Sequence, residues 1–282
     1  MMLLSQAADQ YLEARWIDGY AASTLTAYRL QFSLLIRAIG DQDIEAVTTA
    51  QLRTYLGTLT HLKSASLSHR VRAIHSLWNW LLDEELTERN PSRRIKEHLD
   101  HVRIPKALSV DDLEILRDAC RIPREHALLE LFFATGARLS EMQSMNRLTL
   151  NTQDRTAVVS GKGSKERELY WGAKAALWIT RMLATRTDDD PALFVTLRRP
   201  YRRASKHALY GEIKRIAARV GMADRVWPHV LRHTLATSLL NNGADLTVVQ
   251  SMLGHEKPST TLIYANLSGK RRRQQYDRYF VQ

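Results

Sequence analysis

A basic segment without a sustained apolar period divides the sequence at residues 92–106. It follows Asn90-Pro91, a dipeptide that breaks a helical pattern, and it ends in Ile104-Pro105. Because periodic apolar positions are what bury a helix or strand against its neighbours, such a segment is typical of a connection. The sequence therefore predicts two folding units, an N-terminal domain at residues 1–91 and a second domain at residues 107–282, with residues 92–106 as the linker.

The first domain shows apolar residues at helical spacing throughout. Four helices are expected, and Gly40 is placed to end the second of them. Their predicted starting residues are Leu3, Ser23, Thr48 or Thr49, and Ser66. This domain is expected to be entirely helical.

The second domain begins with a helical pattern and then changes period. Ser109 and Asp112 form a capping pair, and Gly136 stands where a glycine ends an apolar helix at residues 126–135. Residues 156–160 and 167–171 are predicted as strands joined by the turn at residues 161–165, and the chain after about Ala173 as helical. The predicted fold class is mainly α with a small antiparallel β-sheet in this domain.

Charge points to a polyanionic partner. The chain has 41 Lys and Arg against 30 Asp and Glu, a formal net charge of +11. Such an excess favours nucleic acid as the binding partner.

Cys120 is the only cysteine, which excludes a disulfide or a cysteine-based zinc site within one chain. The most apolar stretch, residues 127–134, contains Glu130 and is far too short to span a bilayer, so a soluble cytoplasmic protein with no membrane partner is expected.

Four short motifs stand out in the second domain. They are Thr135-Gly-Ala-Arg-Leu-Ser-Glu141, Gly161-Lys-Gly-Ser-Lys-Glu-Arg167, His229-Val-Leu-Arg-His-Thr234, and Leu253-Gly-His255 followed by Thr260-Thr-Leu-Ile-Tyr264. In this order and spacing the sequence resembles the tyrosine recombinase and integrase family, which includes phage integrases and Xer recombinases. The resemblance is strong from about Ser109 to Leu267 and looser in the N-terminal part. Ala137 departs from the family, which often has a larger apolar residue at that position.

The resemblance implies a role for each motif residue. Tyr264 is the expected nucleophile, and Lys162 matches the lysine that protonates the leaving oxygen. The residues expected at the scissile phosphate are Arg138, His229, Arg232 and His255. Glu141 is expected to orient a neighbouring catalytic side chain. Residues 1–91 then correspond to a DNA-binding core domain, and residues 107–282 to the catalytic domain with a C-terminal tail.

The chemistry supports these residue types independently of any family. A phenol has a pKa of about 10 and is a poor nucleophile at neutral pH. Attack on a phosphodiester gathers negative charge on the non-bridging oxygens, which positioned arginines stabilise through their planar fork of donors. A leaving 5′-oxygen needs a proton from a general acid. Tyrosine, two arginines, lysine and histidine supply these parts, so no metal and no other cofactor is expected.

Several residues keep a second interpretation. Lys165 competes with Lys162 as the general acid. His233 stands at i+4 from His229, a zinc-binding spacing, but Val230 replaces the glutamate of a zincin and a structural role is favoured. The alternative for Glu141 is an exposed i, i+3 partner of Arg138.

A two-domain clamp around duplex DNA is predicted. The candidate DNA-binding residues are Arg93, Arg94, Lys96, Arg103, Lys106, Lys165, Arg198, Arg199, Arg202, Arg203 and Lys206. The resemblance implies paired inverted core sites, a homotetramer that exchanges strands through a Holliday junction, and accessory proteins as further partners. The C-terminal tail, residues 268–282, is predicted to dock on a neighbouring protomer. Because its substrate is DNA, the protein is expected to act at the nucleoid.

Two rival functions remain open at this stage. A type IB topoisomerase shares the phosphotyrosine chemistry but relaxes DNA as a monomer. A non-catalytic DNA-binding regulator would use the same fold without cutting. Helices that start near Leu3 leave no room in these 282 residues for an additional N-terminal DNA-binding domain, so a simple recombinase for dimer resolution, cointegrate resolution or integration is expected.

Overall fold

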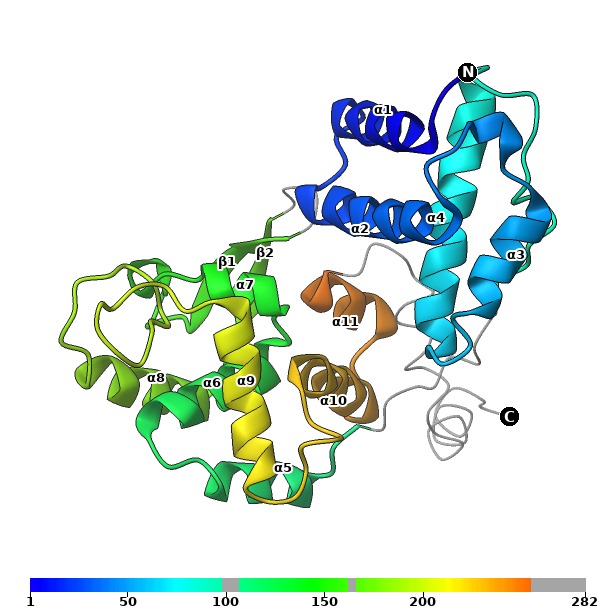
Figure 1. Cartoon of the computed structure of the whole chain (residues 1–282). Coiled ribbons are helices and arrows are strands. Elements are labelled where there is room, and N and C mark those ends of the chain that lie inside the picture. The colour runs from blue at the N-terminus through cyan, green and yellow to red at the C-terminus, as the bar shows by residue number, and fades with distance from the viewer. Residues whose placement is uncertain (98–106, 162–165, 255–282) are drawn as a thin grey trace, which may run out of the picture. The chain divides into compact units, whose positions relative to one another are not determined.

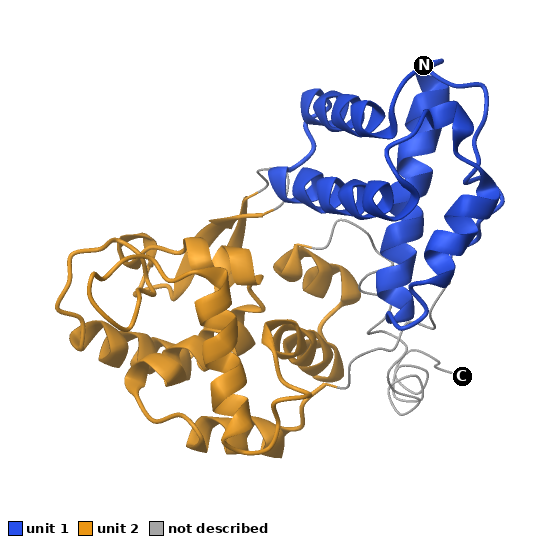
Figure 2. Ribbon diagram, in the orientation of Figure 1, with its two compact units in different colours: residues 1–103 blue, residues 104–282 orange. Residues whose placement is uncertain are grey.

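The computed structural model describes residues 1–97, 107–161 and 166–254. The chain separates into two compact units, residues 1–103 and 104–282, which are called unit 1 and unit 2 below (Figure 2). Helices predominate in both, and the described strands form one two-stranded antiparallel sheet. The predicted fold class, mainly α with a small antiparallel sheet, is confirmed. None of the helices within the described ranges has the length and apolar character needed to cross a membrane.

The described part of unit 1 contains four α-helices, labelled α1 to α4 in Figure 1. Their bounds are Leu4–Ile17 (α1), Ala22–Ile39 (α2), Thr49–Gly57 (α3) and Ser64–Asp83 (α4), with a short 3₁₀ turn at Ile44–Ala46. Tyr11 lies at the centre of the core, with edge-on contacts to the rings of Tyr28, Phe32 and Trp80 at centroid distances of 5.3–5.6 Å. Such edge-to-face pairs add packing energy beyond simple burial.

A side-chain cap marks the start of only one of the helices α1 to α4, namely α3. Thr48 caps α3 as predicted, because its side chain accepts a hydrogen bond from the Gln51 amide. Gly40 ends α2 at a φ of 84°. The predictions for Ser23 and Ser66 were wrong. Ala21 and not Ser23 stands at the N-cap of α2, α4 begins at Ser64, two residues before Ser66, and neither start has a side-chain cap.

Unit 2 combines seven described helices with the sheet. The helices are Val110–Asp118 (α5), Pro123–Thr135 (α6), Leu139–Ser144 (α7), Ala173–Ala184 (α8), Lys206–Ala218 (α9), Pro228–Asn241 (α10) and Leu246–Leu253 (α11), with a 3₁₀ turn at Arg147–Thr149. The strands are Thr156–Ser160 (β1) and Glu166–Tyr170 (β2), with Thr156 paired to Tyr170 and Ser160 to Glu166.

Three predictions for unit 2 need correction. Helix α6 begins at Pro123 and not at residue 126, with the proline in its first turn, where proline is favoured. The second strand begins at Glu166 and ends at Tyr170, one residue before the predicted span at each end. Trp171 still donates its amide to the Arg155 carbonyl, but Arg155 has a φ of 56°, which is not strand geometry. Residues 185–205 are not helical, although the chain after Ala173 was predicted to be. Asp188, Asp190 and Pro191 favour turns there, and the guanidinium of Arg186 holds Asp188 and several carbonyls in a compact loop.

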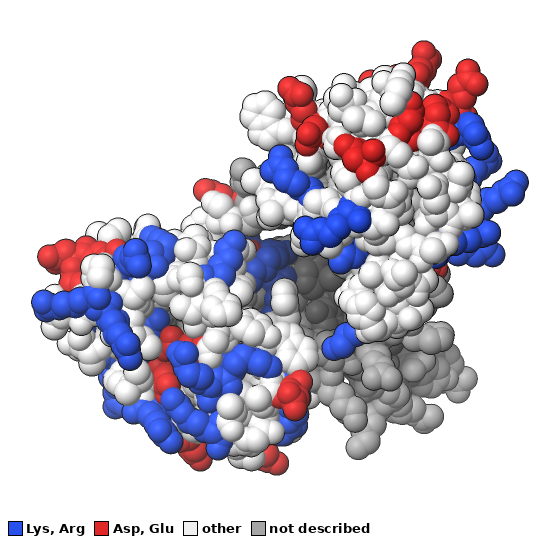
Figure 3. All heavy atoms as spheres, viewed as in Figure 1, with Lys and Arg blue, Asp and Glu red and all other residues white. Residues whose placement is uncertain are grey.

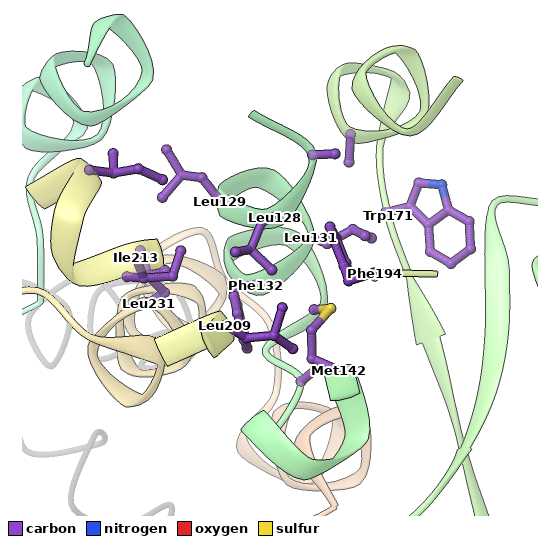
Figure 4. Packing of buried hydrophobic residues seen from close by; sticks show 14 of the residues in the cluster. Leu128, Leu129, Leu131, Phe132, Met142, Trp171, Phe194, Leu209, Ile213 and Leu231 are labelled. Carbon is purple, nitrogen blue, oxygen red and sulfur yellow. The ribbon is translucent and has the colours of Figure 1, made fainter. Parts of the chain in front are cut away.

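Helix α6 is the centre of the unit 2 core. It packs against α8, α9, α10 and β2. Figure 4 shows Leu128, Leu131 and Phe132 of this helix surrounded by side chains from the neighbouring elements, such as Leu231 of α10 and Met142 of α7. Since α6 ends at Gly136, the same packing fixes the point from which Arg138 and α7 depart.

Candidate active site

Arg138 stands at the start of α7, where Glu141 fixes it from one turn away. The Glu141 carboxylate accepts the Arg138 backbone amide at 2.7 Å and Arg138 Nη1 at 2.7 Å. Glu141 is 1% exposed, whereas the Arg138 side chain is 30% exposed. The alternative of an exposed surface pair is therefore wrong. Glu141 lies in the interior and holds the partly accessible guanidinium of Arg138 in place.

Gly136 brings the end of α6 close to two other helices. Its φ of 56° lies in the left-handed region that ends helices. A Cβ atom at this position would lie 2.7 Å from Leu253 Cδ2 and 3.0 Å from Leu235 Cδ2. Glycine is thus needed here both for its backbone conformation and for space.

Arg232 of α10 is almost completely buried, at 5% exposure. Its Nη1 donates to the Gly136 carbonyl at 2.6 Å, and its Nη2 donates to the Leu253 carbonyl at 2.5 Å. A buried charge is costly unless such polar groups receive it. A guanidinium carries its donors in a planar fork, a geometry that suits the two oxygens of a phosphate.

The C-terminal end of α11 receives both candidate arginines. Gly254 ends this helix at a φ of 63°, and its carbonyl accepts Arg138 Nη2 at 2.5 Å. The preceding carbonyl, that of Leu253, accepts Arg232. Cations at a helix C-terminus are stabilised by the helix dipole and by its unpaired carbonyls. Arg138 and Arg232, 94 positions apart in the sequence, are thereby brought to one point.

His229 lies one turn before Arg232 on α10 and has an exposed side chain. The pKa of His229 is lowered, first by desolvation and then by the positive charges of Arg232 and Arg138. His229 and Arg232 stand at i, i+3 on α10 and so lie on one face of that helix. A lowered pKa keeps the imidazole neutral at pH 7, so that it can accept a proton as well as donate a hydrogen bond.

The zinc alternative gains no support at this position. His233 lies on the same helix and is buried at 3% exposure, in agreement with a structural role. Among the described residues, no group of three or more His, Cys, Asp or Glu side chains is arranged to hold a metal ion.

Arg167 is a member of this ionic cluster that sequence reasoning missed. Its Nη2 donates to Glu141 Oε2 at 2.7 Å, and its Nη1 donates to the Met252 carbonyl. A signal was present in the sequence, because Arg167 and Leu169 are two residues apart in a predicted strand and therefore lie on the same face of it. Leu169 is buried, so this is the inward face of β2. An arginine on the inward face of a strand must find partners inside.

Other predicted site residues lie outside the described residues. These are Lys162, Lys165, His255 and Tyr264, together with Arg103 and Lys106. Their assignments remain predictions based on sequence. The structure thus brings together Arg138, Glu141, His229 and Arg232 of the predicted set, and it adds Arg167.

The predicted DNA-binding residues differ in their exposure. In unit 1, Arg93, Arg94 and Lys96 are exposed, and the first two line a pocket of about 690 Å³. In unit 2, the exposed side chains are those of Arg198, Arg199, Arg202 and Lys206. Figure 3 shows Lys and Arg side chains spread widely over the visible face of unit 2.

Arg203 differs from these neighbours because its guanidinium is already bound. It donates to the carbonyls of Gln143 and Met145 at 2.8 and 3.0 Å and to the Asn146 side chain. The side chain therefore anchors the end of α7 and is only partly exposed. Its role in DNA binding stays a prediction.

Comparison with known proteins agrees with this arrangement. Residues 106–271 match the phage integrase family, and residues 8–85 match the phage integrase N-terminal SAM-like domain. Tyrosine recombinase XerD of Ralstonia nicotianae is 33% identical, covering 95% of this chain and 92% of the relative. XerD of Proteus mirabilis is 32% identical, covering 93% and 89%.

Solved structures show the same fold. A Tn1549 transposon integrase in complex with a circular intermediate DNA superposes with a TM-score of 0.80 at 16% identity, covering 99% of this chain and all of that one. A lambda integrase dimer bound to a core site gives a TM-score of 0.77 at 18% identity, covering 92% of this chain and 97% of that one.

Proposed function

Since this chain belongs to the phage integrase family and is a tyrosine-type site-specific DNA recombinase, we propose that it cuts and rejoins duplex DNA through a 3′-phosphotyrosyl bond at Tyr264. The observation that carries this proposal is the meeting of Arg138 and Arg232 at the carbonyls of residues 253–254. Tyr264 follows that point by ten residues in the sequence.

The described side chains supply charge and hydrogen bonds to a phosphate. Arg138 and Arg232 stabilise the negative charge that builds up on the non-bridging oxygens during attack. His229, neutral because of its lowered pKa, accepts the phenol proton or donates to a phosphate oxygen. The Tyr264 oxygen then forms a bond to phosphorus while the bond to the 5′-oxygen breaks, and Lys162 gives that oxygen a proton. The new phosphotyrosyl bond conserves the energy needed for rejoining.

Exchange between two DNA sites needs several protomers. We infer a homotetramer on paired inverted core sites, in which each two-domain protomer closes around duplex DNA and strands pass through a Holliday junction. The tail at residues 268–282 is proposed to join neighbouring protomers, and accessory proteins are proposed as further partners. The reaction takes place on the chromosome, which places the protein at the nucleoid.

Covalent capture tests this function directly. The protein is incubated with fragments of its own flanking genome, and DNA that stays bound on a denaturing gel is sequenced. We expect a discrete adduct with one short site, and none with Tyr264→Phe, which should still bind the same DNA. An adduct formed by the Phe variant would refute Tyr264 as the nucleophile. Joint molecules from two labelled sites would separate a recombinase from a topoisomerase.

The general acid is tested with a modified substrate. A 5′-bridging sulfur leaves without a proton, so it should restore cleavage by Lys162→Ala but not by Arg138→Ala. Equal rescue of both variants would contradict the assignment of Lys162, and rescue of Lys165→Ala alone would move the role to that residue.

Salt dependence tests the DNA contacts. Exposed cations such as Arg93, Arg198 and Lys206 are proposed to neutralise phosphates. Affinity should then fall with a log–log slope of about −0.9 per phosphate contacted. An affinity that hardly changes with salt would contradict a binding mode dominated by phosphate.

A further inference from the structure

Arg167 connects three elements that hold the two candidate phosphate-binding arginines. Its side chain is 9% exposed and extends from β2 into unit 2. There it donates to Glu141 of α7 through Nη2 at 2.7 Å and to the Met252 carbonyl of α11 through Nη1. Its Nε lies 3.4 Å from the second Glu141 oxygen.

The Glu141 carboxylate is shared between Arg167 and Arg138. Oε2 accepts the Arg138 amide and Arg167 Nη2, both at 2.7 Å, while Oε1 accepts Arg138 Nη1 at 2.7 Å. Burial alone would raise the pKa of Glu141, but the hydrogen bond from Arg167 leads the contributions that bring it below its usual range. Without Arg167, this buried carboxylate would keep only Arg138 as its cation among the side chains described around it.

Arg167 also packs directly against the turn that follows α11. A Cβ atom on Gly254 would lie 2.8 Å from Arg167 Cδ and 3.6 Å from Arg138 Nη1. The carbonyls of Met252, Leu253 and Gly254 accept Arg167, Arg232 and Arg138 respectively. Three consecutive carbonyls thus receive three arginines, and the chain continues from there to His255.

We propose that Arg167 is a positioning residue of the active site, which locks Glu141 under Arg138 and fixes the backbone of residues 252–254 where both phosphate-binding arginines are attached. This role rests on the proposed function, since it assumes that Arg138 and Arg232 receive the scissile phosphate. Arg167 itself does not touch the DNA. Its effect reaches the reaction through the placement of Arg138 and of the chain that leads to His255.

A second buried arginine offers a matched control. Arg124 makes a two-pronged ion pair with Glu212, at 3.0 and 3.2 Å, and the two side chains are 11% and 3% exposed. This pair joins α6 to α9, and it contacts none of the carbonyls at residues 252–254. Loss of Arg124 takes from Glu212 the cation that it is paired with, whereas loss of Arg167 leaves Glu141 with Arg138. The control variant is therefore damaged at least as severely, but in another part of unit 2.

The first test compares Arg167→Met and Arg124→Met in cleavage of a suicide substrate that carries the DNA site captured by the wild-type protein. Misplacing a catalytic group by about 1 Å can cost on the order of 100-fold in rate, which is the loss expected for Arg167→Met. DNA affinity should stay unchanged, and Arg124→Met should cleave at the wild-type rate. Arg167→Lys keeps the charge but loses the planar fork, so a partial recovery is expected. An unchanged rate for Arg167→Met, or the same loss in Arg124→Met, would overturn the proposal.

The second test needs no DNA and therefore separates this proposal from the proposed function. NMR titration of the full-length protein reports the pKa of His229, which desolvation and then Arg232 and Arg138 lower. If Arg167 holds Arg138 in place, that pKa should rise toward its ordinary value in both Arg167→Met and Arg167→Lys. A rise in the Met variant alone would reflect only the lost charge and would overturn the proposal. Absence of any covalent adduct with the wild-type protein would instead refute the proposed function, while the titration still decides the role of Arg167.

Discussion

Unit 1 and unit 2 are both largely helical, but their interiors differ in charge. Among the described residues, the buried polar side chains of unit 1 are the uncharged Ser68, Thr87 and Ser92. The described part of unit 2 buries four glutamates, and each receives an arginine; the pairs are Arg219–Glu125, Arg117–Glu130, Arg167–Glu141 and Arg124–Glu212. Two units of one chain thus reach a compact helical fold by different means.

The difference between the two interiors indicates what the buried charges contribute in unit 2. A buried ion pair is seldom more stable than a well-packed apolar replacement, because desolvation of both ions offsets their attraction. We infer that the arginine–glutamate pairs of unit 2 serve geometry more than stability. Unit 1, whose described interior is mainly aromatic and aliphatic, depends on packing and buries no ion pair among its described residues.

Acid should give the largest contrast between the units. Burial alone would raise the pKa of Glu125 and Glu141, but hydrogen bonds from Arg219 and Arg167 respectively lead the contributions that bring both below the usual range. A carboxyl with a folded pKa below its unfolded value stabilises the fold at neutral pH, and this contribution disappears as pH falls through the folded pKa. Below about pH 4, where free carboxyls protonate, unit 2 should therefore unfold first.

Pepsin digestion at about pH 3 can locate that unfolding, because carboxyls are then being protonated. The first cuts mapped by mass spectrometry should fall within α5–α11 and spare α1–α4. First cuts within α1–α4 would contradict the contrast, since the buried polar groups described in unit 1 carry no charge.

Packing should dominate the stability of unit 1. Trp78 is fully buried in its core, and Trp78→Ala should lower the free energy of unfolding of this unit by about 3–5 kcal/mol. The matched change Trp16→Ala, at a side chain that is 68% exposed, should alter it by less than about 0.5 kcal/mol. Urea titration followed by hydrogen exchange measures both. Equal effects would mean that the aromatic core is not what holds unit 1 together.

Removing one member of a buried ion pair should cost unit 2 almost as much. Arg124→Met leaves Glu212 buried without its cation, and a loss of about 3 kcal/mol is expected. The double variant Arg124→Met with Glu212→Leu should regain most of that loss, because it removes both desolvated charges. Failure of the double variant to recover would show that this pair contributes stability in its own right, and the inferred contrast between the units would then weaken.

Local sequence signals predicted the fold well wherever a side chain caps a helix or a glycine ends one. Thr48 and Ser109 have capping boxes, and Gly136 has a positive φ, as their positions in the sequence suggested. The starts after Ala21 and Lys63 were missed because neither residue makes a side-chain cap, so nothing local marks them. The loop at residues 185–205 was missed because the Arg186 contacts that hold it arise only in the folded chain.

The candidate site could be predicted only in part from the sequence. The motifs named Arg138, His229 and Arg232, but the attachment of the two arginines to the carbonyls at residues 253–254 depends on the packing of α6, α10 and α11. Arg167 was overlooked because most of its motif, residues 161–165, predicts a turn that carries a flexible lysine. Arg167 itself lies beyond that turn, on the inward face of a strand. Its spacing of two residues from the apolar Leu169 indicates that Arg167 points inward.

Two glycines with positive φ allow a final and smaller test of the contrast. Gly19 of unit 1 has a φ of 80° and open space where a Cβ atom would lie, whereas Gly136 of unit 2 has a φ of 56° and would place a Cβ 2.7 Å from Leu253 Cδ2. Gly19→Ala should therefore cost only backbone strain, about 1 kcal/mol. Gly136→Ala adds the clash, and about 2–3 kcal/mol is expected.

The two variants should differ more in cleavage than in stability. The Gly136 carbonyl accepts Arg232 Nη1, so any shift that relieves the clash with Leu253 also moves the partner of a candidate catalytic arginine. Gly136→Ala should slow covalent adduct formation on the suicide substrate, on the order of tenfold or more, since small displacements of catalytic groups are costly. Gly19→Ala should cleave at the wild-type rate. If both variants lost only stability, in proportion to their strain, the packing at Gly136 would be structural, and the geometry around Arg232 would tolerate more movement than its two short hydrogen bonds suggest.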